Sequence, residues 1–238
     1  MRVLLISDVH ANWLTLLALQ RAEAEPDAVL FAGDAVGYGP DPEACVSWLG
    51  AHARAAVRGN HDEAVLNGGA PAGLPAGLQQ AAEESLAWTS RRLTPSNRET
   101  LAAWPLTAEA KLGGARFYVC HGTPADPLAG DLHPATAPEA ELRALFEPVA
   151  ADVIVLGHTH LPELRLVGRQ LIVNPGSLGQ PRYGVPDATY AVWDDGRIQI
   201  HHLHYDHGAL AQRLRLARFG PDTLDVLSEV IETGLAPA

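Results

Sequence analysis

The first third of the chain alternates short apolar runs with amphipathic stretches. Residues 2–7 (RVLLIS) and 28–32 (AVLFA) are mainly apolar and predict buried strands. Between them, residues 11–24 carry apolar side chains at helical spacing and predict a helix that Pro26 ends. This strand–helix–strand opening predicts two parallel strands joined by a crossover helix.

The segments that follow predict further helices around one flexible stretch. The predicted elements are a helix near 42–53, a short strand at 55–57 and a helix at about 78–92. Residues 67–77 (NGGAPAGLPAG) resemble a flexible linker. Thr94 and Pro95 predict the N-cap and first position of another helix. The segment 67–110 is either a cap over a site or another layer of the fold.

Strands dominate the second half of the chain. They are predicted at 115–120, 152–156, 169–173, 188–193 and 197–205, with few helices between them. Asp195 and Gly196 predict the hairpin turn that joins the last two strands. The C-terminal segment, about 208–234, predicts one amphipathic helix or two. Because no linker clearly divides the chain, we expect a single α/β domain over residues 1–238.

Composition and charge narrow the classes of partner. Of 238 residues 47% are hydrophobic, which is ample for a sizeable core, and the formal net charge is −11. This charge argues against duplex nucleic acid as a partner, because a phosphate backbone requires a basic surface. It does not exclude a small phosphorylated substrate, since bound metal ions can reverse the local field.

Cysteine usage and apolar run lengths indicate a cytoplasmic protein without a membrane span. Cys45 and Cys120 cannot form a disulfide framework, so both are predicted to be free and buried. The opening MRVLLIS is too short for a signal peptide, and Asp8 interrupts it. No apolar stretch approaches the roughly 20 residues that a membrane span needs.

Side chains able to bind a metal follow five of the predicted strands. They are Asp8 and His10, then Asp34, then Asn60, His61 and Asp62, then His121, and finally His158 and His160. The ends of parallel strands converge on one crevice. In an extended chain residues two apart point to the same side, so the pairs Asp8/His10 and His158/His160 can each present two ligand atoms. This mixture of oxygen and imidazole nitrogen suits Mn, Fe, Ni, Co or Zn. Too many ligands are present for one ion, and they fit two ions roughly 3.5–4 Å apart.

The chain carries five short motifs in a fixed order: D-x-H, G-D, G-N-H-D, H-G and G-H-x-H. This ordered set resembles the signature of the calcineurin-like metallophosphoesterases. The stretches GDAVGYGPDP, HGTPADPL and NPGSLGQPR resemble a branch of small bacterial phosphodiesterase-type members, and the resemblance covers about residues 1–206. It implies an α/β/β/α sandwich, in which two mixed β-sheets are flanked by helices. Ala11 departs from the glycine that commonly follows the D-x-H histidine, and is tolerated unless this residue needs a positive φ.

The resemblance also implies a role for each matching residue. It places Asp8, His10 and His160 on one metal, Asn60, His121 and His158 on the other, and Asp34 as the bridge. Of the possible ions, manganese is favoured. His61 is implied to lie beside the metals as an acid or electrostatic group, with Asp62 orienting it. Arg58 and Arg182 either contact a phosphate oxygen or form surface ion pairs.

The implied activity is hydrolysis of phosphodiesters, small phosphomonoesters or both. A hydroxide bridging the two ions attacks phosphorus, and His61 protonates the leaving oxygen. Two alternatives are weaker. A non-catalytic scaffold is disfavoured because every ligand position is filled. A protein phosphatase typically continues G-D with an Asp-Arg-Gly segment and has G-N-H-E, whereas this chain has GDAVGYG and GNHDEA.

One histidine-rich stretch lies outside these motifs. In HHLHYDHG, residues 201–208, the side chains of His202, His204 and Asp206 alternate onto one face of the predicted strand. They could form another metal site, but an exposed edge strand explains the pattern more simply.

Overall fold

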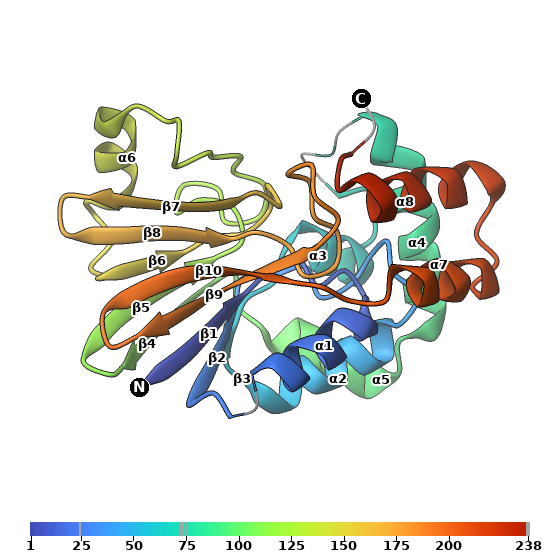
Figure 1. The fold of residues 1–238 in the computed structure, drawn as a ribbon, viewed down its shortest axis with the longest axis horizontal. Helices are drawn as coiled ribbons and strands as arrows, with labels where there is room; N and C mark the ends of the chain where they lie inside the picture. Colours follow the sequence, from blue (N-terminus) through green and yellow to red (C-terminus); the bar gives the residue numbers. More distant parts are fainter. Residues whose placement is uncertain (24, 72–73, 75, 237–238) are drawn as a thin grey trace.

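The fold consists of two five-stranded sheets with helices on their outer sides (Figure 1). The computed structural model describes residues 1–23, 25–71, 74 and 76–236. The first sheet has the order β10-β9-β1-β2-β3, with β1 Arg2–Ile6, β2 Ala28–Phe31, β3 Ala53–Ala56, β9 Ala188–Asp194 and β10 Arg197–Leu203. The second has the order β4-β5-β6-β8-β7, with β4 Thr107–Leu112, β5 Ala115–Cys120, β6 Val153–Val155, β7 Pro162–Val167 and β8 Gln170–Pro175.

Both sheets are mixed, as the resemblance implied. In the first, β1 pairs with β2 in parallel and with β9 in antiparallel orientation, so Leu5 lies between Leu30 and Ala191. In the second, β5, β6 and β8 run parallel, and the edge strands β4 and β7 are antiparallel to their neighbours. The predicted parallel pair of strands at the N-terminus is therefore confirmed.

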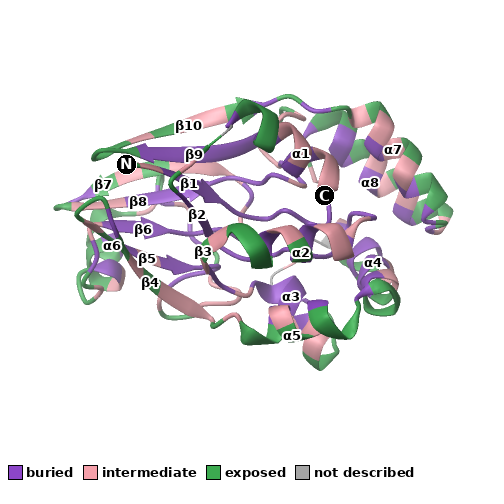
Figure 2. Cartoon of the chain, turned by 90° about the horizontal axis from the view of Figure 1, so that it is seen from below, coloured by how far each residue is buried: buried purple, intermediate pink, exposed green. Residues whose placement is uncertain are grey.

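The strand β1 is apolar along its whole length because both of its faces are buried. Val3 and Leu5 belong to the core between the two sheets, whereas Leu4 and Ile6 belong to the core under the helices. Phe117 of β5 meets Trp193 of β9 edge to face across the sandwich, with ring centroids 5.4 Å apart. Figure 2 shows β1, β2, β6 and β9 as almost wholly buried.

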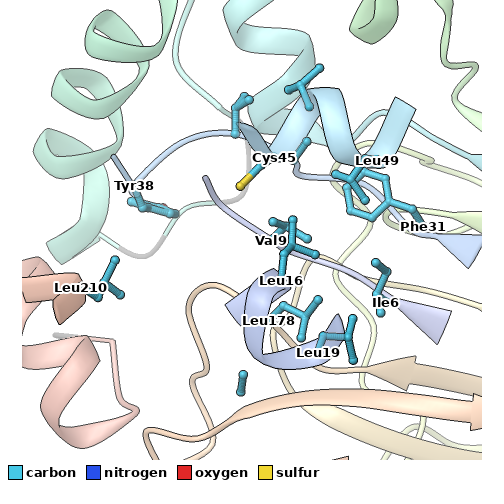
Figure 3. Close-up of a cluster of buried hydrophobic side chains, with 14 of the residues drawn as sticks. Ile6, Val9, Leu16, Leu19, Phe31, Tyr38, Cys45, Leu49, Leu178 and Leu210 are labelled. Carbon is cyan, nitrogen blue, oxygen red and sulfur yellow. The ribbon is translucent and has the colours of Figure 1, made fainter. Parts of the chain in front are cut away.

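Helices cover the outer face of the first sheet and surround the larger core, part of which is drawn in Figure 3. They are α1 Trp13–Ala22, α2 Pro42–His52, α3 Asn60–Asn67, α4 Gln79–Arg92, α5 Pro95–Ala103, α7 His207–Leu216 and α8 Pro221–Thr233. A short 3₁₀ turn, Ala76–Leu78, precedes α4. The helix α6, Glu139–Phe146, packs instead on the outer face of the second sheet, where Leu142 and Phe146 meet Ile154 and Ile172.

Local signals in the sequence marked several element ends correctly. The Thr94 hydroxyl accepts a hydrogen bond from the Asn97 amide and caps α5. Asp195 and Gly196 have φ values of 43° and 90°, as a tight hairpin turn requires. The C-terminal segment forms two helices, and Cys45 and Cys120 are free and buried.

Other expectations need correction. The sequence patterns did not predict α3, α6, β4 or β7. The last strand ends at Leu203 rather than at residue 205. The predicted helix 11–24 runs from Trp13 to Ala22, and residue 24 lies outside the described residues. Of the predicted linker 67–77, residues 72–73 and 75 also lie outside them.

The helices of segment 67–110 belong to the layer that covers the first sheet. α4 packs against α8, and the Ser85 hydroxyl on α4 accepts a hydrogen bond from the Tyr38 amide. This layer of helices therefore packs against the loop after β2 and holds it in place. Among the helices that the structure describes, none is long and apolar enough to cross a bilayer.

Candidate metal centre

The side chains predicted to bind metal lie together, buried between the ends of strands from both sheets. The loops after β1 and β2 supply Asp8, His10 and Asp34, the start of α3 supplies Asn60, and the loops after β5 and β6 supply His121, His158 and His160. The sequence motifs located every one of these side chains. The two sheets contribute jointly, however, rather than one parallel sheet alone.

Three electron-pair donors meet at the first group. The Nε2 atoms of His10 and His160 are 3.1 Å apart, and Asp8 Oδ1 is 3.3 Å from the second of them. Each ring donates its Nδ1 hydrogen to a backbone carbonyl, that of Val36 for His10 and that of Gln180 for His160. Burial lowers the pKa of both imidazoles, so both are neutral and both Nε2 atoms carry a lone pair.

A second group lies around Asp34. Its Oδ2 is 3.3 Å from His121 Nε2 and 3.8 Å from His10 Nε2, so this oxygen stands between the two groups. Asn60 Oδ1 is 3.1 Å from His121 Nε2. Burial alone would lower the pKa of His121, but the Asp34 carboxylate raises it to about 9. A positive charge is therefore favoured at this point.

The donor set fits divalent transition metals. Buried lone pairs facing one another are unfavourable unless a cation lies between them, and Asp8 Oδ1 is buried with no hydrogen-bond partner among the described residues. His158 lies beside His121 with ring centroids 5.2 Å apart, and burial lowers its pKa to about 4, which keeps it neutral. Neutral imidazoles and carboxylates are the ligands that Mn, Fe, Ni, Co and Zn accept.

The backbone at these residues differs from the extended chain that the sequence suggested. Asp8, His10, His158 and His160 have φ values of 53°, 45°, 70° and 61°. Their side chains converge because tight loops turn them inward, so the argument from extended spacing was wrong although its outcome holds. Ala11 has a φ of 50° and thus occupies the conformation in which glycine would be easier.

His61 and Asp62 follow Asn60 on the first turn of α3. The His61 ring packs against the rings of Tyr38 and His10, at centroid distances of 4.7 and 4.9 Å. A Cβ atom on Gly37 would overlap His61 Nδ1, so only glycine fits beside this ring. A ligand atom of His61 also lies within 4.8 Å of those of His10 and Asp34.

Asp62 has a different task from the one expected. Its carboxylate accepts hydrogen bonds from four backbone amides, those of Asp34, Ala35, Val36 and Gly59. It therefore holds the loop that carries Asp34, rather than orienting the His61 ring.

The two arginines lie in different surroundings. Arg58 Nη1 is 3.4 Å from Glu63 Oε2, which is the ion pair named as its alternative role. Arg182 Nη2 donates to Gln180 Oε1 at 2.6 Å, and its guanidinium carbon lies 5.9 Å from the centre of the Tyr38 ring.

Sequence reasoning missed Tyr38 and Gln180. Both are buried, and neither the Tyr38 hydroxyl nor Gln180 Nε2 has a hydrogen-bond partner within the described part of the chain. Burial raises the pKa of Tyr38 to about 12, so its hydroxyl remains a donor. The only signal for them was their place in the Gly-rich stretches GDAVGYGPDP and NPGSLGQPR.

The stretch NPGSLGQPR holds the loop after β1 in place through hydrogen bonds. The Ser177 hydroxyl donates to the Asp8 carbonyl at 2.7 Å, and the Gly179 amide donates to the same carbonyl at 2.8 Å. A Cβ atom on Gly179 would overlap the Val9 carbonyl oxygen, so glycine permits the close approach of the two loops.

Comparison with known proteins gives a consistent result. A family model described as the calcineurin-like phosphoesterase superfamily domain matches residues 1–195. The phosphodiesterase YfcE of Escherichia coli K12 is 27% identical over 89% of this chain and 97% of its own. An uncharacterized protein of Methanocaldococcus jannaschii, MJ0912, is 28% identical over 86% of this chain and 88% of its own. The crystal structure of a metallophosphoesterase from Sphaerobacter thermophilus superposes with a TM-score of 0.81 at 26% identity, covering 99% of both chains.

Proposed function

Because the chain belongs to the calcineurin-like phosphoesterase superfamily and is a phosphoric ester hydrolase, we propose that it uses two divalent metal ions to hydrolyse phosphodiesters, small phosphomonoesters or both. The relative YfcE is named a phosphodiesterase, which supports phosphodiesters among the substrates. The acidic net charge of the chain is compatible with a phosphate substrate, since two divalent ions outweigh the carboxylates of Asp8 and Asp34.

The observation that carries the proposal is the meeting of buried carboxylate, amide and imidazole ligand atoms in two adjoining groups. His10, His160 and Asp8 would hold one ion, and Asn60, His121 and His158 the other. Asp34 would bridge them, because its Oδ2 faces both groups while its Oδ1 accepts from the His61 amide at 2.9 Å. When bound, such ions stabilise charge on the phosphoryl group and activate water for attack on phosphorus.

Three buried donors beside this centre would recognise the phosphate. The Tyr38 hydroxyl, Gln180 Nε2 and Arg182 Nε are each without a hydrogen-bond partner among the described residues. Leaving such donors unpaired costs free energy, and an anionic ester oxygen would satisfy them. The contact between the Arg182 and Gln180 side chains keeps two of them together. These contacts support Arg182, rather than Arg58, as the arginine that would contact the substrate.

His61 would act on the leaving group. Burial lowers its pKa to about 4, so in the free protein the ring is neutral and can donate a hydrogen bond. A negatively charged ester next to the ring favours its protonated form, and the proton can pass to the leaving oxygen as the bond to phosphorus breaks. Tyr38 and Gly37 hold the ring in place for this role.

The test is a hydrolysis screen on protein stripped of metal and then reloaded with Mn²⁺. We expect hydrolysis of bis-(p-nitrophenyl) phosphate that a chelator abolishes and Mn²⁺ restores. An Arg182→Ala variant should lose activity at unchanged metal content, whereas Arg58→Ala should retain activity. Metal-loaded protein inert toward diesters, monoesters and nucleotides would refute the proposal. A clear preference for phosphopeptides would instead indicate a protein phosphatase.

A further inference from the structure

A second cluster of metal-competent side chains lies away from the centre described above. It consists of Asp187 in the loop before β9, His204 just after β10 and His207 at the start of α7. One ligand atom from each of the three lies within 4.8 Å of those of the other two. The histidines come from the stretch HHLHYDHG, which the sequence interpretation assigned to an exposed edge strand.

The actual geometry differs from that interpretation. Because β10 ends at Leu203, His204 does not share a strand face with Asp206, and Asp206 caps α7 by accepting from the Ala209 amide. His202 is bonded elsewhere, since its Nδ1 lies 3.0 Å from the Tyr183 hydroxyl. The turn into α7 instead brings His207 next to His204, with ring centroids 5.3 Å apart.

Two of the three side chains are held in place. Asp187 Oδ1 lies 3.0 Å from His204 Nδ1, which links the end of the loop to the end of β10. The His207 ring packs edge on against Tyr205 at 4.2 Å, and its Nε2 is buried with no hydrogen-bond partner among the described residues. A buried imidazole nitrogen without a partner is unfavourable unless a ligand such as a cation satisfies it. The third side chain, His204, is 80% exposed, so its ring has room to reorient when its bond to Asp187 is exchanged for a bond to a metal ion.

We propose that Asp187, His204 and His207 bind a divalent transition ion of the Zn²⁺ class, separate from the phosphoesterase centre. Two imidazoles and one carboxylate form a common three-residue zinc ligand set that leaves a position for water or another ligand. Tetrahedral ligation at about 2.0–2.1 Å requires ligand atoms about 3.3 Å apart, which rotation of the exposed His204 ring can achieve. The alternative is an isolated ion pair between Asp187 and His204, which would contribute little to stability because His204 is so exposed.

Because of the position of this cluster, an ion bound there would affect the stability of the fold. Asp187 ends the loop that begins after β8 and carries Gln180 and Arg182. His204 and His207 line a groove of about 1030 Å³ that α1 borders through Leu14 and Leu17. An ion here would join the loop, the edge strand and α7 at one point. Because it binds only the folded chain, it would raise the melting temperature.

The test counts zinc ions bound at saturation by equilibrium dialysis. The proteins compared are the wild type, Asp187→Asn, His204→Ala and, as a matched control, His202→Ala, which removes a histidine of the same stretch outside the cluster. We expect the wild type and the control to bind one more ion per chain than the two cluster variants. Zinc should also shift the side-chain ¹⁵N resonances of His204 and His207 in the wild type.

Equal zinc content in all four proteins, or unshifted His204 and His207 resonances, would overturn the proposal and leave only an ion pair. The side chains changed are at least partly exposed, so the variants should fold, and circular dichroism checks this. The result does not depend on the phosphoesterase centre. Failure of that centre would remove ions from all four proteins alike, whereas failure of this cluster would remove the difference between them.

Discussion

At the scale of single residues, the candidate metal centre depends on backbone conformations that are unfavourable for most residues. Asp8, His10 and Asp34 have positive φ values, and a non-glycine residue in this region costs roughly 1–2 kcal/mol. Hydrogen bonds between the loops offset this cost, since the Asp8 amide donates to the Gly33 carbonyl and the His10 amide to the Asp34 carbonyl. Such strain concentrates at functional sites because the surrounding structure fixes it there.

Tyr38→Phe should separate stability from activity. Removing a buried hydroxyl without a partner should leave the free energy of unfolding unchanged or higher. If that hydroxyl binds phosphate, kcat/KM should fall about 10-fold or more. Tyr205→Phe is the matched control, because Tyr205 is another buried tyrosine whose hydroxyl has no partner among the described residues. Its kcat/KM should not change, and full activity in Tyr38→Phe would exclude the hydroxyl from the site.

His61→Gln should retain both metal ions and lower kcat by about 10²–10⁴-fold on an ester with a poor leaving group. On an aryl ester the loss should be smaller, because that leaving oxygen needs little protonation. His158→Gln, which removes a proposed ligand, should lower metal affinity as well as the rate of hydrolysis. Metal analysis and kinetics on both esters test this. Equal metal loss in the two variants would make His61 a ligand, as its closeness to His10 and Asp34 allows.

At the scale of elements, the sequence indicated those whose apolar pattern is strong. Continuous apolar runs marked β1 and β2 because both faces of these strands are buried. The helix α3 (NHDEAVLN) was not predicted because it is short and mostly polar. Its start is fixed by tertiary contacts with the loop that carries Asp34. The edge strand β4 (TAEAKL) carries Glu109 and Lys111 on its exposed face. In β7 (PELRLV) the exposed residues are Leu164 and Leu166, and charged residues alternate with them. Neither strand has the continuous apolar run that marked β1 and β2.

Asp62→Ala should be among the most destabilising changes at the start of α3. It leaves four amides of buried backbone without their acceptor, so the free energy of unfolding should fall by about 3 kcal/mol or more. Metal affinity should fall too, because the Asp34 loop loses its support. Asp152→Ala, which removes a half-exposed carboxylate paired with Arg116, should cost at most about 1 kcal/mol. Denaturant unfolding of both variants measures the difference, and a similar cost for the two would contradict the assigned role of Asp62.

The contact that Glu23 makes between β1, α1 and β9 should stabilise the fold by an amount that depends on pH. Glu23 is buried, pairs with Arg2 and accepts from the Tyr190 hydroxyl at 2.7 Å. Burial would raise its pKa, but the hydrogen bonds from Arg2 and Tyr190 bring it below its ordinary value of 4.5. This stabilisation is therefore present above about pH 4.5 and is lost as the pH falls through the lowered pKa.

Glu23→Gln should accordingly lower the free energy of unfolding at pH 7 by about 1.5–3 kcal/mol, and by less below pH 4.5. Urea unfolding at both pH values checks this. Glu139→Gln, which breaks an exposed pair with Arg143, should have little effect at either pH. A cost for Glu23→Gln that does not shrink on acidification would show that the charge of Glu23 is not what stabilises this contact.

At the scale of the whole molecule, the candidate metal centre is built from loops of both sheets. The sequence could therefore predict its residues, but not how the two sheets bring them together. Asp8, Asp34, His121 and His158 were recognisable because metal-competent residues rarely follow so many strands in one chain. That their strands belong to two different sheets depends on pairings between distant segments, such as β1 with β9. The cluster around His204 depends likewise on where β10 ends, which no local pattern specified.

Metal loading should therefore act on the whole fold. Mn²⁺ should bind at two tight sites per chain and raise the melting temperature, because ions that bind only the folded chain stabilise it. Asp34→Asn should weaken both ions by removing the bridge, whereas Asn60→Ala should affect mainly one. Metal analysis and calorimetry on the same samples test this. At most one tightly bound ion after reconstitution with excess Mn²⁺ would contradict a dinuclear centre.

The place of β1 in the middle of the first sheet has a consequence for how the chain is made. β1 pairs with β2 soon after both have been synthesised, but its other neighbour, β9, begins only at Ala188. A growing chain therefore holds one edge of β1 unpaired until β9, Ala188–Asp194, has emerged. Pairing across so long a separation is slow, and the exposed edge is open to wrong partners. On the ribosome, the pairing of β1 should thus be completed only after β9 has been synthesised, so assembly of the first sheet depends on a segment made long after β1.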